Sequence, residues 1–313
     1  MKVEFKHDPV MLREVIDGLN VKENGTYIDA TVGGAGHSIE IAKLLNADGL
    51  LIGIDQDPEA LKAAAKRLSG FECSVKLVSS NFSDIADVVD HVGAEHVDGI
   101  LMDIGVSSYQ LDESSRGFTY REDVPLDMRM NPSVEITAAY IVNKEPEDKL
   151  CQIIGQYGEE RWAARIAKFI CERRKEGPIA TTGELVDIIR AAVPKGARQE
   201  GIHPARRTFQ ALRIAVNDEL GSLERGIKGA VKVLGSEGRL AILSYHSLED
   251  RIVKQAFRQM EEPCTCPREM PVCICGLKPV IRVITRKPEL PSDAEIERNP
   301  RARSAKLRIA QKL

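Results

Sequence analysis

The chain has 313 residues, of which 43% are hydrophobic, and a formal net charge of −3. This length suits one large or two modest domains, and the composition is that of a soluble α/β protein. The small net charge excludes a global field that attracts nucleic acid, so any such binding depends on local basic faces. Residues 1–7 lack the apolar stretch of a signal peptide and no later run approaches the length of a membrane span, so we expect a cytoplasmic protein.

The first hundred residues alternate between strand-like and helix-like segments. The expected strands are 25–29, 50–54, 74–78 and 97–104, and the expected helices are 38–45, 58–68 and 83–92. Alternation of this kind predicts a parallel sheet with helices on both faces, connected by right-handed crossovers.

A glycine-rich turn, residues 31–38, connects the first expected strand to the first helix. Gly33, Gly34 and Gly36 let the backbone approach a ligand closely, and the helix that follows directs its N–H groups at that ligand. The segment therefore predicts a nucleotide-type ligand, with a tight turn that binds nothing as the alternative. Ile39 stands where the dinucleotide fingerprint requires its third glycine, which weakens a pyrophosphate interpretation.

An acid, Asp29, precedes this turn. The combination resembles the first motif of S-adenosylmethionine-dependent methyltransferases, from which Thr31 and Ala35 depart. Asp55 ends the second strand about twenty residues after the glycines, where such folds place an acceptor for ribose hydroxyls. It could instead stabilise the start of the next helix, although Asp57 fits that capping position better.

Several candidate ligand residues fall at the carboxyl ends of expected strands: Asp29, Asp55, the pair Asn81-Phe82, and Asp103. Parallel strands bring their carboxyl ends to one edge of a sheet, so we expect these side chains to share a site. Nicotinamide dinucleotides and S-adenosylmethionine both carry a ribose diol, so Asp55 does not separate them. A nicotinamide-dependent oxidoreductase, however, would account only for the turn and Asp55.

After Asp103 the pattern changes to helical periodicity, with no strand-like run from Gln110 to about Gly201. The remaining expected strands are 239–244, 279–285 and 305–310, with helical patterns over 209–233 and 248–260. We therefore predict a helical domain, 110–208, inserted into a discontinuous sheet domain, 1–109 and 209–313. Seven strands closed by an antiparallel hairpin favour a methyltransferase sheet over a six-stranded dehydrogenase sheet.

Segments along nearly the whole chain resemble one family, the bacterial small-subunit ribosomal RNA methyltransferases of the H type. The matching segments are 6–11, 31–38, 103–112, 116–118, 125–130, 157–161, 244–251 and 299–304. The resemblance implies an α/β fold: a Rossmann-like, seven-stranded S-adenosylmethionine-dependent methyltransferase sheet with an inserted all-helical domain that recognises the substrate. It also implies methyl transfer to the exocyclic N4 amine of a specific cytidine in the decoding region of 16S rRNA. The partner is then the small ribosomal subunit, no membrane is involved, and a homodimer is left open.

The resemblance also assigns S-adenosylmethionine contacts. The residues are Ala35, Gly36, His37, Asp55, Phe82, Asp103 and Gln110. Phe82 would pack against adenine unless it is a core residue, and His37 would bind the methionine moiety unless it only caps its helix. Gln110 would close over the ligand, or it is a solvated loop residue.

Methyl transfer to an amine needs a proton acceptor beside the target nitrogen. Other amino methyltransferases carry an Asp/Asn/Ser-Pro-Pro-aromatic motif after the fourth strand, which residues 103–106 replace without either proline. Asp103 is therefore the first candidate for the catalytic acceptor. His246, at the end of the next strand, is the second and is equally well explained as a structural histidine.

A base within folded RNA must leave its stack before its amine can react, so we expect basic contacts near the site. The candidates are Arg198, His203, Arg206, Arg207, Arg213, Arg301, Arg303, Lys306 and Arg308. Arg301 and Arg303 rank first because they precede an expected strand beside the cleft. A non-catalytic RNA-binding assembly factor would account for the same basic residues.

Seven cysteines in a chain without a signal peptide do not indicate a secreted disulfide framework. The last four form two C-x-C pairs separated by six residues: Cys264, Cys266, Cys273 and Cys275. With proline and glycine beside them for tight turns, they are candidate ligands of a structural zinc ion. A cluster of reduced thiols is the alternative.

Overall fold

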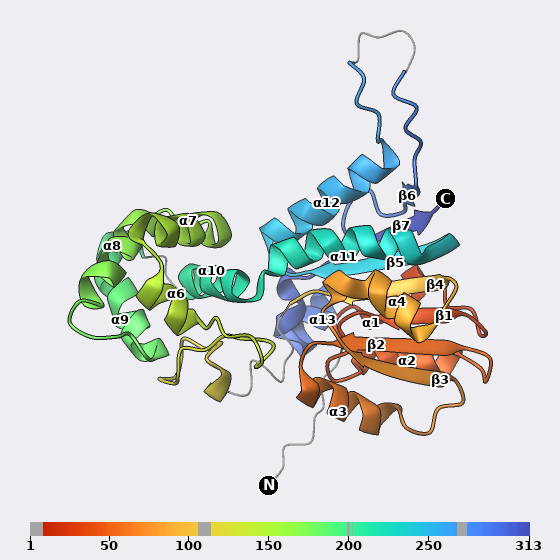
Figure 1. The fold of residues 1–313 in the computed structure, drawn as a ribbon, viewed down its shortest axis with the longest axis horizontal. Coiled ribbons are helices and arrows are strands. Elements are labelled where there is room, and N and C mark those ends of the chain that lie inside the picture. The colour runs from red at the N-terminus through yellow and green to blue at the C-terminus, as the bar shows by residue number, and fades with distance from the viewer. Residues whose placement is uncertain (1–8, 106–113, 199–200, 202, 268–273) are drawn as a thin grey trace. The chain divides into compact units, whose positions relative to one another are not determined.

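The chain folds into two compact units (Figure 1). The computed structural model describes residues 9–105, 114–198, 201, 203–267 and 274–313. The sheet unit comprises Met1–Gly105 and Leu220–Leu313, and the helical unit comprises Val106–Glu219. The sequence placed the divisions after residues 109 and 208; the second differs by a whole helix, α10 (Arg206–Asn217), which belongs to the helical unit.

The sheet unit is built on a seven-stranded sheet with the order β3-β2-β1-β4-β5-β7-β6. The strands from β1 to β5 pair in parallel, whereas β7 is antiparallel to both β5 and β6. The strands are β1 (Thr26–Asp29), β2 (Leu50–Asp55), β3 (Ser74–Ser79), β4 (Val97–Asp103), β5 (Leu234–Ser244), β6 (Ile281–Val283) and β7 (Lys306–Lys312). The seven strands and their closing antiparallel pairs confirm the sheet expected from the sequence.

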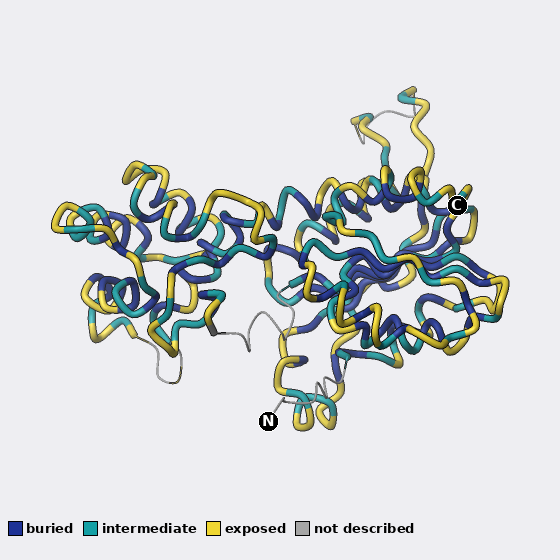
Figure 2. The backbone as a smooth tube through the Cα atoms, turned by 60° about the horizontal axis from the view of Figure 1, so that its bottom comes forward, coloured by how far each residue is buried: buried dark blue, intermediate teal, exposed yellow. Residues whose placement is uncertain are grey.

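Neighbouring residues of the central strands point to opposite faces of the sheet, and both faces are buried. Tyr27 and Leu51 belong to the apolar cluster on one face, whereas Ile28 and Ile52 belong to the cluster on the other. Figure 2 shows these strands as buried segments between more exposed helices. The first cluster is covered by α1 (Leu12–Leu19), α2 (Gly36–Leu44) and α3 (Pro58–Leu68), and the second by α4 (Ile85–Val92), α11 (Glu219–Val233) and α12 (Ser247–Glu261).

One long helical pattern, predicted over 209–233, is two helices in the structure. α10 ends at Asn217, and Asp218 adopts left-handed backbone angles, with φ 46° and ψ 42°. Asp and Asn tolerate this conformation better than most residues, so the sequence Asn217-Asp218 permits a break that periodicity alone does not reveal. Sequence patterns also did not anticipate α1 or the short α13 (Asp293–Arg298).

The described part of the helical unit contains helices and an isolated β-bridge, between Pro125 and Thr181, but no strand. Besides α10, its α-helices are α6 (Ala138–Lys144), α7 (Glu147–Gly158), α8 (Ala163–Arg173) and α9 (Thr182–Ala192). They enclose an apolar core of their own that extends along the chain from Phe118 to Val216. Over the described residues of both units, no helix combines the length and the apolar character needed to cross a bilayer.

Candidate functional site

Three acidic residues end strands at one edge of the sheet. Asp29 closes β1, Asp55 closes β2 and Asp103 closes β4. Because these strands are parallel neighbours, the three carboxylates lie at the carboxyl ends, where open α/β sheets bind their ligands. The structure therefore places these acids where the strand pattern predicted them.

Left-handed backbone at two positions forms the turn from β1 to α2. Gly33 has φ 46° and Ala35 has φ 59°, a conformation that is costly for a residue with a Cβ atom. α2 then begins at Gly36 without a side-chain cap, so the N–H groups of its first turn point out of the helix at this edge. A Cβ atom on Gly36 would lie 3.1 Å from the Cβ of Pro9, closer than an ordinary van der Waals contact, so the packing here favours glycine.

Backbone N–H groups fix the Asp55 carboxylate. Gly33 donates to Oδ2 and Asp57 donates to Oδ1, each at 2.9 Å. Burial raises the pKa of Asp55 to about 6, against the lowering effect of these two hydrogen bonds. The Asp57 side chain accepts from the N–H of Glu59 at 3.1 Å and caps α3, which confirms the capping position assigned to it from the sequence.

Asp29, the last residue of β1, makes hydrogen bonds to residues of the glycine-rich turn and of α2. Its Oδ2 accepts from the hydroxyl of Ser38 at 2.5 Å, and its Oδ1 accepts from the N–H of Thr31 at 3.2 Å. The residue is only 2% exposed, and burial raises its pKa. Asp29 thus shapes the glycine-rich turn from the interior, and nothing in the sequence pattern singled out Ser38 as its partner.

Hydrogen bonds with Tyr245 and Thr31 help to fix Asp103. The Tyr245 hydroxyl donates to Oδ1 at 2.6 Å, and the N–H of Asp103 donates to the hydroxyl oxygen of Thr31 at 2.8 Å. Burial, followed by the negative charge of Asp103, raises the pKa of Tyr245 well above its usual value, so the phenol keeps its proton and remains a donor. Sequence analysis missed Tyr245, although its position directly after β5, at the same edge as Asp103, was an available signal.

His37 connects Asp103 to the N-terminal segment. Its Nε2 lies 2.9 Å from the carbonyl oxygen of Val10, which can only accept, so Nε2 carries a proton and donates. Its Nδ1 lies 3.7 Å from Oδ2 of Asp103, and the residue is 5% exposed. The imidazole therefore lies between Val10 and Asp103, where it helps to fix the site, and it does not cap α2.

His246 has a structural position at the start of α12. Its Nδ1 accepts from the N–H of Glu249 at 3.4 Å, and its Nε2 lies 3.1 Å from Oε1 of the same residue. Glu249 is fully buried, and its Oε2 accepts from the N–H of Tyr245 at 2.8 Å. His246 and Glu249 together form a capping box at the start of α12. The box fixes the backbone of Tyr245, so these two residues act on the site by positioning the Tyr245 hydroxyl beside Asp103.

Comparison with known proteins identifies the family. A family model described as the MraW methylase family matches residues 4–313. The chain belongs to this family. Ribosomal RNA small subunit methyltransferase H of Symbiobacterium thermophilum is 57% identical over 309 residues, which cover 99% of this chain and 97% of the relative. The protein of the same name from Clostridioides difficile is 53% identical over 311 residues, with 99% and 100% covered.

Family membership and topology together confirm the predicted fold class, the Rossmann-like sheet of S-adenosylmethionine-dependent methyltransferases. Among solved structures, an rRNA methylase from Streptococcus thermophilus aligns over 96% of this chain and 92% of its own, at 13% identity and a TM-score of 0.41. The fold assignment does not depend on that weak similarity.

Two further residues, Phe82 and Gln110, were predicted to contact the cofactor. Phe82 lies in a short 3₁₀ helix, Phe82–Asp84, and packs against α11, where a Cβ atom on Gly226 would lie 2.7 Å from its ring. The structure thus supports the core interpretation of Phe82, and its contact with adenine stays a prediction. Gln110 lies outside the described residues.

Several basic residues that were predicted to contact RNA bond within the chain. Arg213 donates to both carboxylate oxygens of Glu219, at 2.8 and 2.9 Å. Arg308 and Lys306 bond to Asp250 at 2.7 and 3.2 Å, and Arg308 is only 6% exposed. Because these two guanidinium groups already bond to buried or half-buried carboxylates, and because breaking such a pair is costly, an RNA contact is disfavoured for Arg213 and Arg308.

The other basic candidates are more accessible. Arg207 donates to the carbonyl oxygen of Glu159 at 3.0 Å, and Arg198 donates to that of Arg190 at 2.6 Å. Exposed candidates are Arg198, Arg206, Arg207, Arg301 and Arg303. Arg206 and Arg207 begin α10 in the helical unit, whereas the last two lie in a short 3₁₀ helix of the sheet unit, Pro300–Ser304.

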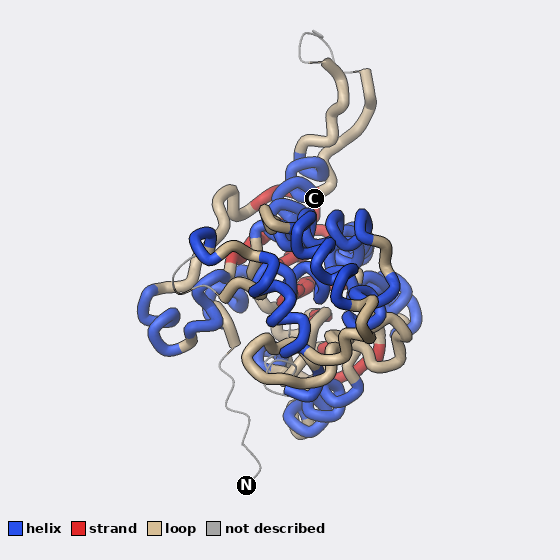
Figure 3. Tube along the Cα trace, turned by 90° about the vertical axis from the view of Figure 1, so that its left-hand side faces the viewer, coloured by secondary structure: helices blue, strands red, loops and turns tan. Residues whose placement is uncertain are grey.

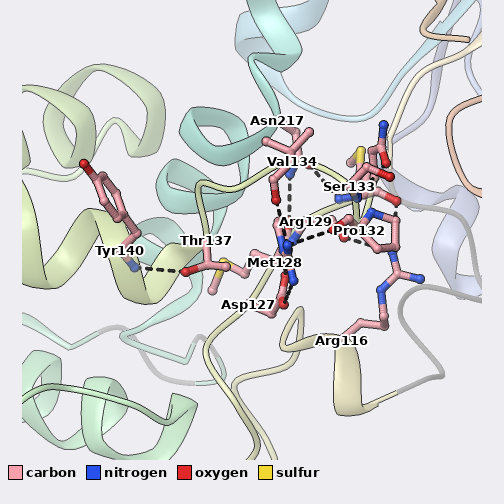
Figure 4. Close-up of polar contacts among 12 residues, drawn as sticks. Arg116, Asp127, Met128, Arg129, Pro132, Ser133, Val134, Thr137, Tyr140 and Asn217 are labelled. Atoms are coloured by element: carbon pink, nitrogen blue, oxygen red, sulfur yellow. Dashed lines mark hydrogen bonds and ion pairs between the residues drawn. The ribbon is translucent and has the colours of Figure 1, made fainter.

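Arg129 organises the segment that precedes α6 in the helical unit (Figure 4). Its guanidinium donates to both carboxylate oxygens of Asp127, at 2.8 and 2.7 Å, and to two backbone carbonyls. Arg116 donates to the carbonyl oxygens of Arg129 and Met130, at 2.9 Å each. Burial opposes ionisation of Asp127, but the hydrogen bonds from Arg129 outweigh it and lower the pKa of this carboxyl.

The structure brings three of the four candidate zinc ligands together. The sulfur atoms of Cys264, Cys266 and Cys275 all lie within 4.8 Å of one another. Cys273 lies outside the described residues.

Proposed function

We propose that this chain is an S-adenosylmethionine-dependent methyltransferase that modifies ribosomal RNA of the small subunit, at the exocyclic N4 amine of a specific cytidine in the decoding region. The observation that carries the proposal is similarity over the full length: relatives named ribosomal RNA small subunit methyltransferase H are 53–57% identical over 99% of the chain. The modified atom and its place in the rRNA come from the motif resemblance and need direct product analysis.

The sheet edge offers the groups that S-adenosylmethionine requires. Each oxygen of Asp55 accepts one backbone hydrogen bond and keeps a further lone pair, which suits the two ribose hydroxyls. The uncapped first turn of α2, Ala35 to His37, offers N–H donors to the methionine carboxylate. Asp103 offers an acceptor to the methionine ammonium or to the target amine. When bound, S-adenosylmethionine supplies an activated methyl group.

Asp103 is the proposed proton acceptor for the target amine. The lone pair of that amine is delocalised into the cytosine ring, so reaction needs both in-line placement and removal of a proton. The Tyr245 hydroxyl holds Oδ1 of Asp103, and Oδ2 lies on the side of His37. His246 is the weaker candidate because its ring caps α12.

The helical unit is the proposed substrate-recognition domain. The target base must leave its stack, which requires contacts to the RNA on either side of it. Exposed arginines such as Arg206 and Arg303 are proposed to contact phosphates and so to position the RNA without reading its sequence. An rRNA substrate would also place the activity in the cytoplasm.

Transfer of tritiated methyl groups from S-adenosylmethionine tests the proposal. The purified chain is incubated with small ribosomal subunits, naked 16S rRNA or 70S ribosomes that lack the modification, and the RNA is digested to nucleosides. We expect N4-methylated cytidine on one of these substrates, which also identifies the assembly state that is modified. Methylation of another nucleoside would overturn the assigned atom. Tight cofactor binding without transfer to any substrate would favour an RNA-binding assembly factor.

A further inference from the structure

An arm of the sheet unit, residues 262–280, leaves the body after α12 and returns at β6. Its base is closed by two hydrogen bonds: the N–H of Val280 donates to the carbonyl oxygen of Met260 at 3.0 Å, and that of Val283 donates to the Glu261 side chain at 2.8 Å. Beyond this base, the described arm residues form no helix or strand. Figures 1 and 3 show the two sides of the arm extending together away from α12.

The described residues of the arm have no apolar core that could hold the two sides together. Ile274 is 75% exposed, Leu277 is 52% exposed and Val280 is 40% exposed. Ordering each residue of such a segment costs about 1 to 2 kcal/mol of backbone conformational entropy. Small folds that cannot bury enough apolar surface often use a disulfide or a metal ion to hold their parts together.

Cysteine sulfurs lie where such a cross-link is needed. Cys264 and Cys266 are on the outgoing side of the arm and Cys275 is on the returning side, with all three sulfurs within 4.8 Å of one another. Tetrahedral zinc with Zn–S bonds of about 2.3 Å places its sulfur ligands about 3.8 Å apart. The three thiols therefore need to approach one another by about 1 Å or less to share one ion.

We propose that these cysteines bind one structural Zn²⁺ ion that joins the two sides of the arm. The three described sulfurs carry the proposal, and Cys273, which the sequence analysis also named, lies outside the described residues. Each thiol that binds releases its proton to solvent, and no oxidant or reductant is involved. Sulfur-rich tetrahedral sites select zinc or iron–sulfur clusters, so the metal itself must be identified.

Metal analysis of the purified full-length chain is the first test. We expect about one zinc per chain and no stoichiometric iron. The double variant Cys264→Ser/Cys275→Ser should lose the zinc, whereas Cys151→Ser, a partly buried cysteine on α7 in the helical unit, should retain it. Replacement of zinc by Co²⁺ should give the visible absorption of tetrahedral cobalt–thiolate, which the double variant lacks.

Limited proteolysis of the wild-type chain provides a readout that does not depend on how the variants fold. Removal of zinc with a chelator should accelerate cleavage within residues 262–280 and leave the sheet unit and its S-adenosylmethionine affinity unchanged, because the hydrogen bonds of Val280 and Val283 close the base of the arm without the metal. Zinc well below one per chain, iron in its place, or disulfides among these cysteines by mass spectrometry would each overturn the proposal.

Discussion

Tyr245 and Asp103 define the chemistry available at the sheet edge. A protonated phenol at 2.6 Å from Oδ1 favours the carboxylate form of Asp103 and fixes its orientation. The position of Asp103 at a strand end predicted that it belongs to the site. Its partner, Tyr245, follows a strand that is distant in the sequence, so the pair is visible only in the folded sheet. The hydrogen bond between His37 and Val10 was likewise not visible in the sequence pattern.

Replacement of Asp103 by Asn separates cofactor binding from catalysis. Asn keeps the size of the side chain but cannot take a proton from the amine, so we expect cofactor affinity within a few-fold of wild type and turnover lower by about 10² to 10⁴. Calorimetric binding of S-adenosylmethionine and single-turnover methyl transfer measure the two quantities. Asp90→Asn, an exposed change on α4, is the matched control.

Loss of both binding and turnover in Asp103→Asn would assign Asp103 to the cofactor alone. Tyr245→Phe sharpens the distinction, because it removes the hydroxyl donor and keeps the ring. If Tyr245 positions Asp103 for catalysis, this variant loses turnover by roughly tenfold with little change in cofactor affinity.

Asp55 makes cofactor binding depend on pH. Burial raises its pKa to about 6, so it is an ionised acceptor above that pH and gains a proton below it. Protonation removes lone pairs that the backbone donors and the ribose would share, so affinity should be constant above about pH 6 and fall roughly tenfold about one unit lower. Binding isotherms across this range measure the inflection. Asp55→Asn should bind weakly at every pH, and a wild-type profile without inflection would contradict the ribose assignment.

At the scale of elements, the alternation of strands and helices in the sheet unit was predictable from the sequence, whereas the irregular segments that connect elements were not. Strand β2 is a short apolar run in the sequence because its neighbouring residues enter opposite apolar clusters and both faces are buried. The segment before α6 shows the opposite case. Met128 has φ 64° and is held because Asn217 donates to its carbonyl oxygen at 2.8 Å, a contact between residues far apart in the sequence.

The Asp127–Arg129 pair is predicted to stabilise this segment. Replacement of Asp127 by Asn leaves the Arg129 guanidinium without its charged acceptor and should lower the free energy of unfolding by about 2 kcal/mol. The pKa of Asp127 is lowered from 3.8, so this stabilisation is fully present above about pH 3.8 and is lost as pH falls through the lower, folded-state value. Thermal unfolding at neutral pH measures the effect, with the exposed Glu135→Gln as control. Equal melting temperatures would show that the pair contributes no net stability.

For the whole molecule, the order of strands and helices predicted the sheet with its inserted helical unit, whereas the second division was displaced because Asp218 breaks the long helical pattern. The candidate site shows the same limit. Asp29, Asp55 and Asp103 follow from the chain order of strands, but Ser38, Tyr245 and Glu249 contribute through packing between elements. These described acids and their partners all belong to the sheet unit.

Among the described residues, the apolar core of the helical unit is drawn from that unit alone, and this predicts that the unit folds without the sheet unit. A fragment of residues 106–219 lies within the usual size of a domain, and α6 to α10 bury their apolar faces against one another. We expect a helical circular dichroism spectrum, a cooperative thermal transition and no S-adenosylmethionine binding. A second fragment that ends at residue 205 removes α10, which supplies Phe209 and Leu212 to the core, and should not fold. A non-cooperative melt of the longer fragment would mean that its core is completed only in the intact chain.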